Sequence, residues 1–217
     1  KEKFKNLETI PIGICKNNLE IKCFDFKNTK TNLVVSNRIT STVNFVKSLL
    51  MELRLIKNYN IVVVDSESIL NLDKKNFPNY YHDSFQDIIN NLNKNFEELI
   101  QTGKDNYGVI VLNGIEKLIN KIDSKSMLED LIKSIKKYEK YNILVIESAS
   151  KLKNYAFEEW YKSLTSDASG VYIGNGVTEQ SILKISSYSR EMTQNLKDDM
   201  GYFIVDSSGE LCKFIDF

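Results

Sequence analysis

The sequence has no excess of charge of either sign and few of the residues that build metal sites or disulfides. Lys and Arg together number 29, as do Asp and Glu, so the formal net charge of the 217 residues is zero. Proteins that bind duplex nucleic acid usually carry a basic excess, so this balance argues against nucleic acid as the main ligand. His82 is the single histidine, and Cys15, Cys23 and Cys212 are scattered without a C-x-x-C pair. Neither a zinc site nor a disulfide framework is indicated, which fits reduced cysteines in a cytosolic domain.

Long apolar runs are also absent. A membrane-spanning helix needs about 18 or more apolar residues in succession, and the longest run here, Ile61–Val64, has the length of a strand. The chain starts at Lys1 with no methionine and no signal-like segment, so we expect a piece cut from a longer polypeptide. Apolar residues make up 42% of the chain, which is enough for a core. We assign residues 1–217 to a single domain.

Short apolar runs alternate with segments of helical periodicity. This order predicts a largely parallel sheet with helices on both faces, an α/β fold. The central strands are expected at Leu33–Val35, Ile61–Asp65, Gly108–Leu112, Asn142–Ile146 and Val171–Ile173. The helices are expected at 43–53, at Asp83–Gln101 with Asp83 as its cap, at Ser124–Tyr138 and at Asn154–Leu164.

The two ends of the chain predict further strands. Ile10–Ile14 and Leu19–Phe26 alternate apolar and polar residues on either side of an Asn-Asn turn. Tyr202–Asp206 and Glu210–Phe214 flank a Ser-Ser-Gly turn and predict a terminal β-hairpin. We treat these strands as additions to the central sheet. The segment Thr178–Ile185 fits a short helix or a strand equally well.

The loop after the first central strand has the length of a nucleotide-binding phosphate loop but none of its required residues. Such a loop, G-x-x-x-x-G-K-[ST], uses glycines to bring backbone N–H groups to the phosphates, a lysine for the β and γ oxygens, and a hydroxyl for magnesium. Ser36 and Ser41 stand at the two glycine positions, Thr42 at the lysine and Val43 at the hydroxyl. Two interpretations are open: a nucleotide fold that has lost its chemistry, or an ordinary connection between a strand and a helix. The candidate loop comprises Ser36, Asn37, Arg38, Ile39, Thr40, Ser41, Thr42 and Val43.

The ends of the other strands supply the remaining candidates, because ligands of open α/β sheets bind at the carboxyl ends of the strands. An active nucleotide hydrolase would carry an acid pair after the third strand, where this chain has Asn113 and Gly114. Asp65 and Glu147 end the second and fourth strands. Each acid could orient a ligand or simply cap the following turn. His82, without a partner Ser or Cys motif, is a weak candidate for catalysis.

One aromatic group has two interpretations. Tyr155, Phe157, Trp160 and Tyr161 fall on the predicted helix Asn154–Leu164. Core packing is the default interpretation, and a patch that binds a partner protein is the alternative, because the rings cover more than one helix face.

Four segments resemble the last ATPase-like domain of the membrane-anchored ATPases of type VII secretion, the EssC/EccC proteins of the FtsK/SpoIIIE group. Ile10–Ile14 (IPIGI) is similar to the family's entry strand, and Thr31–Leu50 to its Walker A strand, loop and helix with the Walker residues replaced. Leu144–Tyr161 (LVIESASKLKNYAFEEWY) and Gly170–Gln180 (GVYIGNGVTEQ) carry the more specific resemblance. Together the segments are spread over most of the chain, from residue 10 to residue 180.

The resemblance implies a RecA-like P-loop NTPase fold and a parent chain of tandem ATPase domains on the cytoplasmic side of the cell membrane. It further implies a hexameric parent that exports small WXG100-type proteins, with a terminal domain that recognises substrates and regulates the motor. Carried over by position, the nucleotide loop is Ser36–Val43 and the Walker B position is Asn113. Both depart from the motif, so we expect no ATP hydrolysis and no metal site, with weak binding of ATP and magnesium left open.

We therefore expect a domain that binds secreted substrates and neighbouring ATPase domains. Two alternatives stay open at this point. The first is a nucleotide hydrolase with an unusual loop that uses Arg38 and Glu147. The second is a DNA-translocating module of the same superfamily, against which the zero net charge argues.

Overall fold

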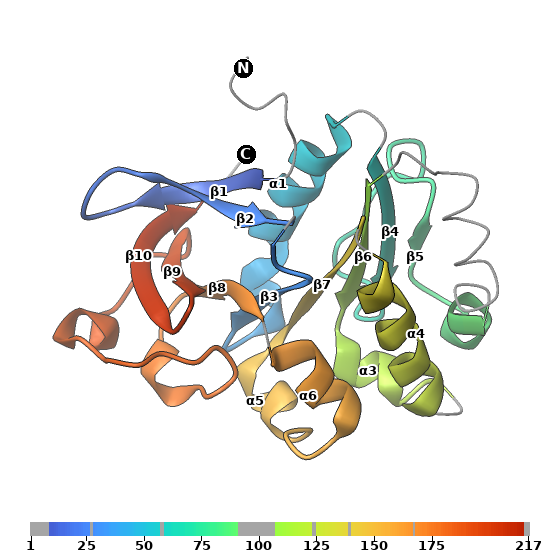
Figure 1. Cartoon of the computed structure of the whole chain (residues 1–217). Coiled ribbons are helices and arrows are strands. Elements are labelled where there is room, and N and C mark those ends of the chain that lie inside the picture. The colour runs from blue at the N-terminus through green and yellow to red at the C-terminus, as the bar shows by residue number, and fades with distance from the viewer. Residues whose placement is uncertain are drawn as a thin grey trace.

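The chain forms one continuous mixed sheet, which curls at one end (Figure 1). The structure is a computed structural model and describes residues 9–26, 28–56, 59–90, 107–122, 125–138, 140–166 and 168–214. Within these residues, ten strands pair in the order β2-β1-β10-β9-β8-β3-β7-β6-β4-β5. The predicted α/β fold with a largely parallel central sheet is confirmed.

The parallel part of the sheet contains the strands expected from the apolar runs, each extended by one or more residues. Ladders of parallel pairs join β8 to β3, β3 to β7, β7 to β6, β6 to β4 and β4 to β5. Nearly every residue of the central strands is buried, as expected for strands covered on both faces. Their bounds are β3 Thr31–Ser36, β4 Tyr59–Asp65, β5 Tyr80–Tyr81, β6 Tyr107–Asn113, β7 Tyr141–Ser148 and β8 Ser169–Ile173.

The antiparallel part brings the two ends of the chain together. The predicted terminal hairpin is confirmed, and its turn falls at Asp206 and Ser207, which both have positive φ. This hairpin continues the central sheet by pairing with β8, and the N-terminal hairpin then pairs with β10. The terminal strands therefore extend the sheet and do not decorate it. The bounds are β1 Thr9–Cys15, β2 Ile21–Asp25, β9 Met200–Val205 and β10 Ser208–Phe214.

Helices cover the two faces of the sheet and enclose two separate hydrophobic cores (Figure 1). Helix α1 packs on one face with Val46, Leu50 and Leu53, as its spacing predicts. The other helices supply the core on the opposite face. The bounds are α1 Val43–Arg54, α3 Ile115–Ile119, α4 Lys125–Lys137, α5 Ala149–Lys153 and α6 Glu159–Thr165.

Two predicted helices differ from the structure. The helix expected at Asn154–Leu164 is confirmed only in its second half, because α6 begins at Glu159 and residues 154–158 form a turn that follows α5. Glu158 has an extended backbone, which breaks the helix before Glu159. In the other helix the first helical residue is Phe85, so Asp83 lies too early to be its cap. The expected continuation over 91–101 lies outside the described residues.

The segment Thr178–Ile185 contains neither an α-helix nor a strand. A 3₁₀ turn, η2, spans Val177–Glu179, and the buried Gln180 side chain organises the residues after it. Its Oε1 accepts hydrogen bonds from the N–H groups of Ile182 and Leu183, each at 2.8 Å, and its Nε2 donates to the Leu183 carbonyl at 2.8 Å. The Gln180 side-chain amide thus satisfies backbone groups that the hydrogen bonds of a helix or a strand would otherwise satisfy.

Candidate functional site at the carboxyl ends of the parallel strands

The loop between β3 and α1 is wound into a tight 3₁₀ turn. Ile39–Thr42 form this turn, η1, and Val43 begins α1. The N–H of Ser41 donates to the Arg38 carbonyl at 2.9 Å, and the N–H of Val43 donates to the Thr40 carbonyl. A phosphate loop needs such N–H groups to point at the ligand, whereas these two point back into the loop.

The side chains of the loop are also engaged within it. Ser36 Oγ donates to the Arg38 carbonyl at 2.5 Å, and Thr42 Oγ1 donates to the Ile39 carbonyl at 2.6 Å. The Ile39 side chain packs against the core on the α1 face and holds the turn down on the sheet. Arg38 is exposed, as are Thr40 and Ser41. The residues at the lysine and second glycine positions are therefore part of a closed turn.

Asn37 ties this loop to the loop after β8. Its Nδ2 donates to the Asn175 carbonyl at 2.9 Å, and its Oδ1 accepts a hydrogen bond of 2.6 Å from the Tyr172 hydroxyl. Burial raises the pKa of Tyr172 to about 12, so the phenol stays protonated and able to donate. Gly176, at φ 91°, packs against the Asn37 side chain so closely that an added Cβ would overlap it. The two loops form one interlocked surface.

A cavity of about 400 Å³ lies beside the loop, and its acidic residues are unsuited to phosphate. The wall includes Asp198 and Asp199, and Lys213 Nζ lies 3.3 Å from the Asp199 carboxylate. Two carboxylates against one ammonium repel a polyphosphate, which in active sites is held by cations. The cavity is lined by Thr40, Ser41, Asn44, Phe45, Ile173, Asp198, Asp199 and Phe214.

Asp65 and Asn113 meet on the α1 face of the sheet. They are paired in the β4–β6 ladder, and Asn113 Nδ2 donates to Asp65 Oδ1 at 2.6 Å. Asp65 Oδ2 accepts two more hydrogen bonds of 2.9 Å, from the Tyr80 hydroxyl and the Leu70 N–H. The Asp65 side chain is fully buried, so its carboxylate is directed at protein donors and not at solvent. Burial, with the bond to Asp65, raises the pKa of Tyr80 to about 12.

Glu147 lies on the opposite face, away from this pair. Side chains alternate along a strand, and Val145 belongs to the core opposite α1, whereas Val63 belongs to the core beneath α1. The sheet therefore brings Asp65 and Asn113 together and separates Glu147 from both. One strand, β7, also stands between Asn113 and the loop after β3, which places the two candidate positions about 10 Å apart.

Glu147 sits in a cluster of charges that the sequence analysis missed. The buried carboxylate accepts hydrogen bonds from the N–H groups of Ser148 at 2.8 Å and Glu116 at 3.1 Å. Lys151 Nζ lies 2.9 Å from Glu67, 3.4 Å from Glu116 and 3.8 Å from Glu147. The i, i+4 spacing of Glu147 and Lys151 is the signal that could have found this pair.

The cluster has opposite effects on its acids. Burial raises the pKa of Glu147 above its ordinary value. Burial also acts to raise the pKa of Glu67, but the ammonium groups of Lys151 and Lys117 outweigh it and the pKa is lowered. Burial lowers the pKa of Lys151, and its three carboxylate partners more than reverse that effect. These ion pairs tie α3 and α5 to the sheet edge, which is a structural role.

The aromatic group divides between the two interpretations. Trp160 and Tyr161 are buried in the core opposite α1, and Tyr155 packs on the Trp160 ring at a centroid distance of 5.2 Å. Phe157 is 90% exposed at the turn between α5 and α6. The His82 ring packs against the Tyr80 ring at a centroid distance of 5.4 Å, and the Ser68 hydroxyl donates to the His82 backbone carbonyl at 3.2 Å and not to the imidazole.

The described residues contain neither a metal-binding cluster nor a helix that could span a membrane. No group of three or more His, Cys, Asp or Glu side chains there is arranged to hold a metal ion. None of the helices described is both long enough and apolar enough to cross a bilayer.

The strand order gives a mixed α/β domain, and its structural neighbours are domains with the P-loop ATPase fold. The particular likeness is to type VII secretion ATPases. EssC (ATPases 2 and 3) from Geobacillus thermodenitrificans superposes with a TM-score of 0.80 over 98% of this chain and 42% of that chain, at 15% identity. A structure of the cytoplasmic domain of EssC gives 0.80 over 99% of this chain and 46% of that chain, at 16% identity.

A third neighbour carries a bound peptide. Thermomonospora curvata EccC (ATPases 2 and 3), in complex with a signal sequence peptide, superposes with a TM-score of 0.74 at 14% identity, over 97% of this chain and 41% of that chain. The chain thus spans less than half the length of these neighbours. At such identities the likeness shows the fold, and it confirms at that level the resemblance found in the sequence. No family model matches the sequence. No curated protein matches it either.

Proposed function

We propose that this chain is a non-hydrolysing ATPase-like domain of a type VII secretion motor, and that its role is to bind proteins. The observation that carries the proposal is the closed loop after β3. The Ser41 and Val43 N–H groups and the Ser36 and Thr42 hydroxyls all bond within the loop. Binding a polyphosphate there would require breaking these bonds without a lysine to compensate.

The residues at the positions where a nucleotide hydrolase carries its acids support the same conclusion. Asn113 stands where the magnesium-binding acid is expected, and its amide is bonded to Asp65. Glu147 faces the other side of the sheet, beside Lys151 and backbone N–H donors. A hydrolase that combined Arg38 with Glu147 would need both side chains at one γ-phosphate. The structure leaves Arg38 on an exposed turn and Glu147 in the interior.

The proposed partners come from the structural neighbours and from the resemblance in the sequence. One neighbour is described in complex with a signal sequence peptide, and two are described as containing ATPases 2 and 3. We propose that this domain recognises the signal segments of secreted WXG100-type proteins and contacts neighbouring ATPase domains of a hexameric motor. Its place would be the cytoplasmic face of the cell membrane. A rigid sheet without a γ-phosphate switch can still present a preformed groove.

Calorimetric titrations test the two halves of the proposal. ATP with magnesium should give no heat of binding and no phosphate release. A signal-segment peptide from a secreted protein should bind at micromolar to millimolar concentration. Micromolar ATP binding with turnover that Arg38→Ala abolishes would instead establish the hydrolase. A gel shift with duplex DNA at low salt that persists at physiological salt would favour a DNA-binding module.

A further inference from the structure

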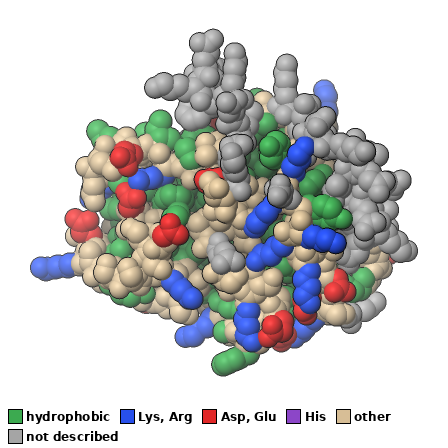
Figure 2. Space-filling model, in the orientation of Figure 1, with side chains coloured by type: hydrophobic (Ala, Val, Ile, Leu, Met, Phe, Trp, Pro, Cys, Tyr) green, Lys and Arg blue, Asp and Glu red, His purple; other side chains and the backbone are tan. Residues whose placement is uncertain are grey.

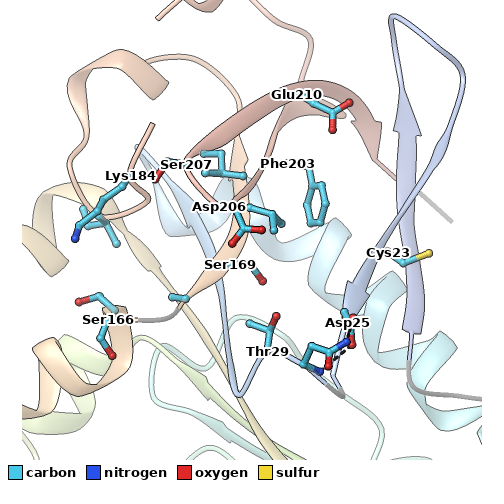
Figure 3. Close-up of a pocket in the computed structure, with 16 residues that line it drawn as sticks. Cys23, Asp25, Thr29, Ser166, Ser169, Lys184, Phe203, Asp206, Ser207 and Glu210 are labelled. Carbon is cyan, nitrogen blue, oxygen red and sulfur yellow. Dashed lines mark hydrogen bonds between the residues drawn. The ribbon is translucent and has the colours of Figure 1, made fainter. Parts of the chain in front are cut away.

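A hollow of about 840 Å³ lies at the opposite edge of the sheet from the candidate nucleotide loop. It is bounded by β2, by the β9–β10 hairpin, by the end of α6 and by the start of β8 (Figure 3). In the close-up, Asp25 and Thr29 stand on one side of the space, Lys184 and Ser166 on the other, and Asp206 at the hairpin above it. The site is distinct from the closed loop, since Ser169 and Thr29 lie at the amino-terminal ends of β8 and β3.

Strand β2 presents an unpaired edge beside this hollow. It is the last strand in the sheet order of the described residues, and β1 occupies its other side. β2 lines the hollow at Cys23 and Asp25, and Ile21, on the same face, is 56% exposed. The Cys15 N–H bonds to the Glu20 carbonyl, so the next pair, Ile14 and Ile21, is not hydrogen-bonded.

The backbone groups of Ile21 therefore point outward, and by alternation so do those of Cys23. The partner of Cys23 in β1 is Pro11, which has no N–H to offer it. Strand β2 therefore offers outward backbone groups at Ile21 and Cys23, and the side chains of Cys23 and Asp25 line the hollow. An exposed edge of this kind is a template for a further strand.

The charged side chains around the hollow indicate which kind of peptide could pair with the edge of β2. Among the described residues that line the hollow, Asp25, Asp206 and Glu210 carry carboxylates and Lys184 carries an ammonium. Lys22 neutralises Glu210 at 2.7 Å, and the Asn28 amides bond to Asp25, so Asp206 at the hairpin turn is the most exposed of the acids. Figure 2 shows acidic side chains gathered on the side that carries the β-hairpins and basic ones on the side of α4.

We propose that the hollow is a docking site for an extended peptide segment bearing lysine or arginine, which adds as a strand to the free edge of β2. An apolar side chain of the segment lies beside Ile21, and a basic side chain on the same face reaches Asp25 and Asp206. This inference rests on the proposed protein-binding function and names a site and a chemical class of segment for it.

Fluorescence anisotropy with a labelled extended peptide of alternating valine and lysine tests the proposal on the intact chain. We expect saturable binding that weakens with added salt, because the contacts are ionic at the rim. A peptide with glutamate in place of lysine should not bind. Two further peptides carry N-methyl groups on alternate backbone nitrogens, one at the odd residues and one at the even residues. One of the two should bind roughly tenfold more weakly, because its methyl groups remove the hydrogen bonds to the edge of β2.

Variants locate the site. Asp206→Asn and Asp25→Asn should each weaken the lysine peptide by roughly two- to fivefold. The matched control Asp130→Asn, an equal change of charge on the exposed face of α4, should leave affinity unchanged. Urea unfolding of each variant shows whether the fold is kept.

The outcomes separate this site from the broader function. If a secretion signal peptide binds with an affinity that neither the two variants nor backbone methylation alters, the β2 site is refuted and the protein-binding function stands. If neither that peptide nor the lysine peptide binds at millimolar concentration, both proposals fail.

Discussion

Replacing Asp65 tests whether the acid at the end of β4 is structural or kept for a ligand. Its carboxylate is fully buried and accepts hydrogen bonds from Leu70, Tyr80 and Asn113 at 2.6–2.9 Å. Asp65→Ala leaves three buried donors without an acceptor. Each orphaned donor costs about 1–3 kcal/mol, and relaxation recovers part, so we expect a loss of roughly 3–5 kcal/mol. That is a large share of the about 5–15 kcal/mol by which a domain is stable.

The assay is equilibrium unfolding in urea followed by circular dichroism. Tyr80→Phe should cost about 1 kcal/mol alone, and nearly nothing in the Asp65→Ala background, where the hydroxyl has already lost its acceptor. Asp73→Ala is the matched control. Asp73 also accepts an N–H bond, from Lys75 at 3.0 Å, but it is exposed, so we expect a cost below about 1 kcal/mol.

If the effects of Asp65→Ala and Tyr80→Phe on the free energy of unfolding simply add in the double variant, the two side chains do not share a hydrogen-bond network. A loss below about 1 kcal/mol for Asp65→Ala would refute the structural role, because carboxylates held for a ligand commonly burden the fold and their removal leaves stability unchanged or raised.

Three further changes probe other parts of the molecule. The pKa of Glu67 is lowered in the folded protein, so the ionised carboxylate stabilises the fold above its ordinary pKa of 4.5, and this contribution is lost as the pH falls. Lys151→Met removes the ammonium that lowers this pKa, so we expect a loss of about 1–2 kcal/mol at neutral pH. In urea unfolding, the difference from the unchanged protein should shrink as the solution is acidified. Cys15 and Cys212 stand directly opposite each other in the β1–β10 ladder, so diamide should link them slowly, since burial raises the pKa of Cys212 to about 12. The disulfide would close a loop of about 200 residues and should add roughly 5 kcal/mol to the free energy of unfolding by the chain-entropy account. Peptide mapping that finds a different cysteine pair would contradict the register of β1 and β10. Phe157→Ser should change the free energy of unfolding by less than about 0.5 kcal/mol, because the ring is 90% exposed.

The central strands could be predicted because burial on both faces demands continuous apolar runs. Val62–Val64 and Ile143–Ile146 have no polar residue to confuse the pattern. The five-residue helices α3 and α5 were missed because they are too short to show a period of 3.6. The pairing of β1 with β10 joins residues about 200 positions apart, and no local pattern encodes which edge a terminal strand will choose.

The candidate site was predictable in place but not in geometry. The residues absent from the loop after β3 are evident from the motif alone, whereas the closure of that loop depends on carbonyl acceptors that no motif describes. Asp65 and Glu147 looked alike in the sequence, each the acid at the end of a strand. The alternation of side chains put them on opposite faces, one among neutral donors and the other beside an ammonium.

The carboxyl ends of the parallel strands and the free edge of β2 differ in how their polar groups are engaged within the protein. The two cores lie on the two faces of the sheet and are built from apolar side chains of the strands and helices. At the carboxyl ends of the strands, hydrogen bonds satisfy the side chains of Ser36, Thr42 and Asp65, whereas Asn113 Oδ1 is buried without a hydrogen-bond partner. At the other edge β2 still carries backbone groups pointing outward. Backbone groups on an exposed strand edge can form hydrogen bonds with a bound peptide, so we expect recognition at the edge of β2.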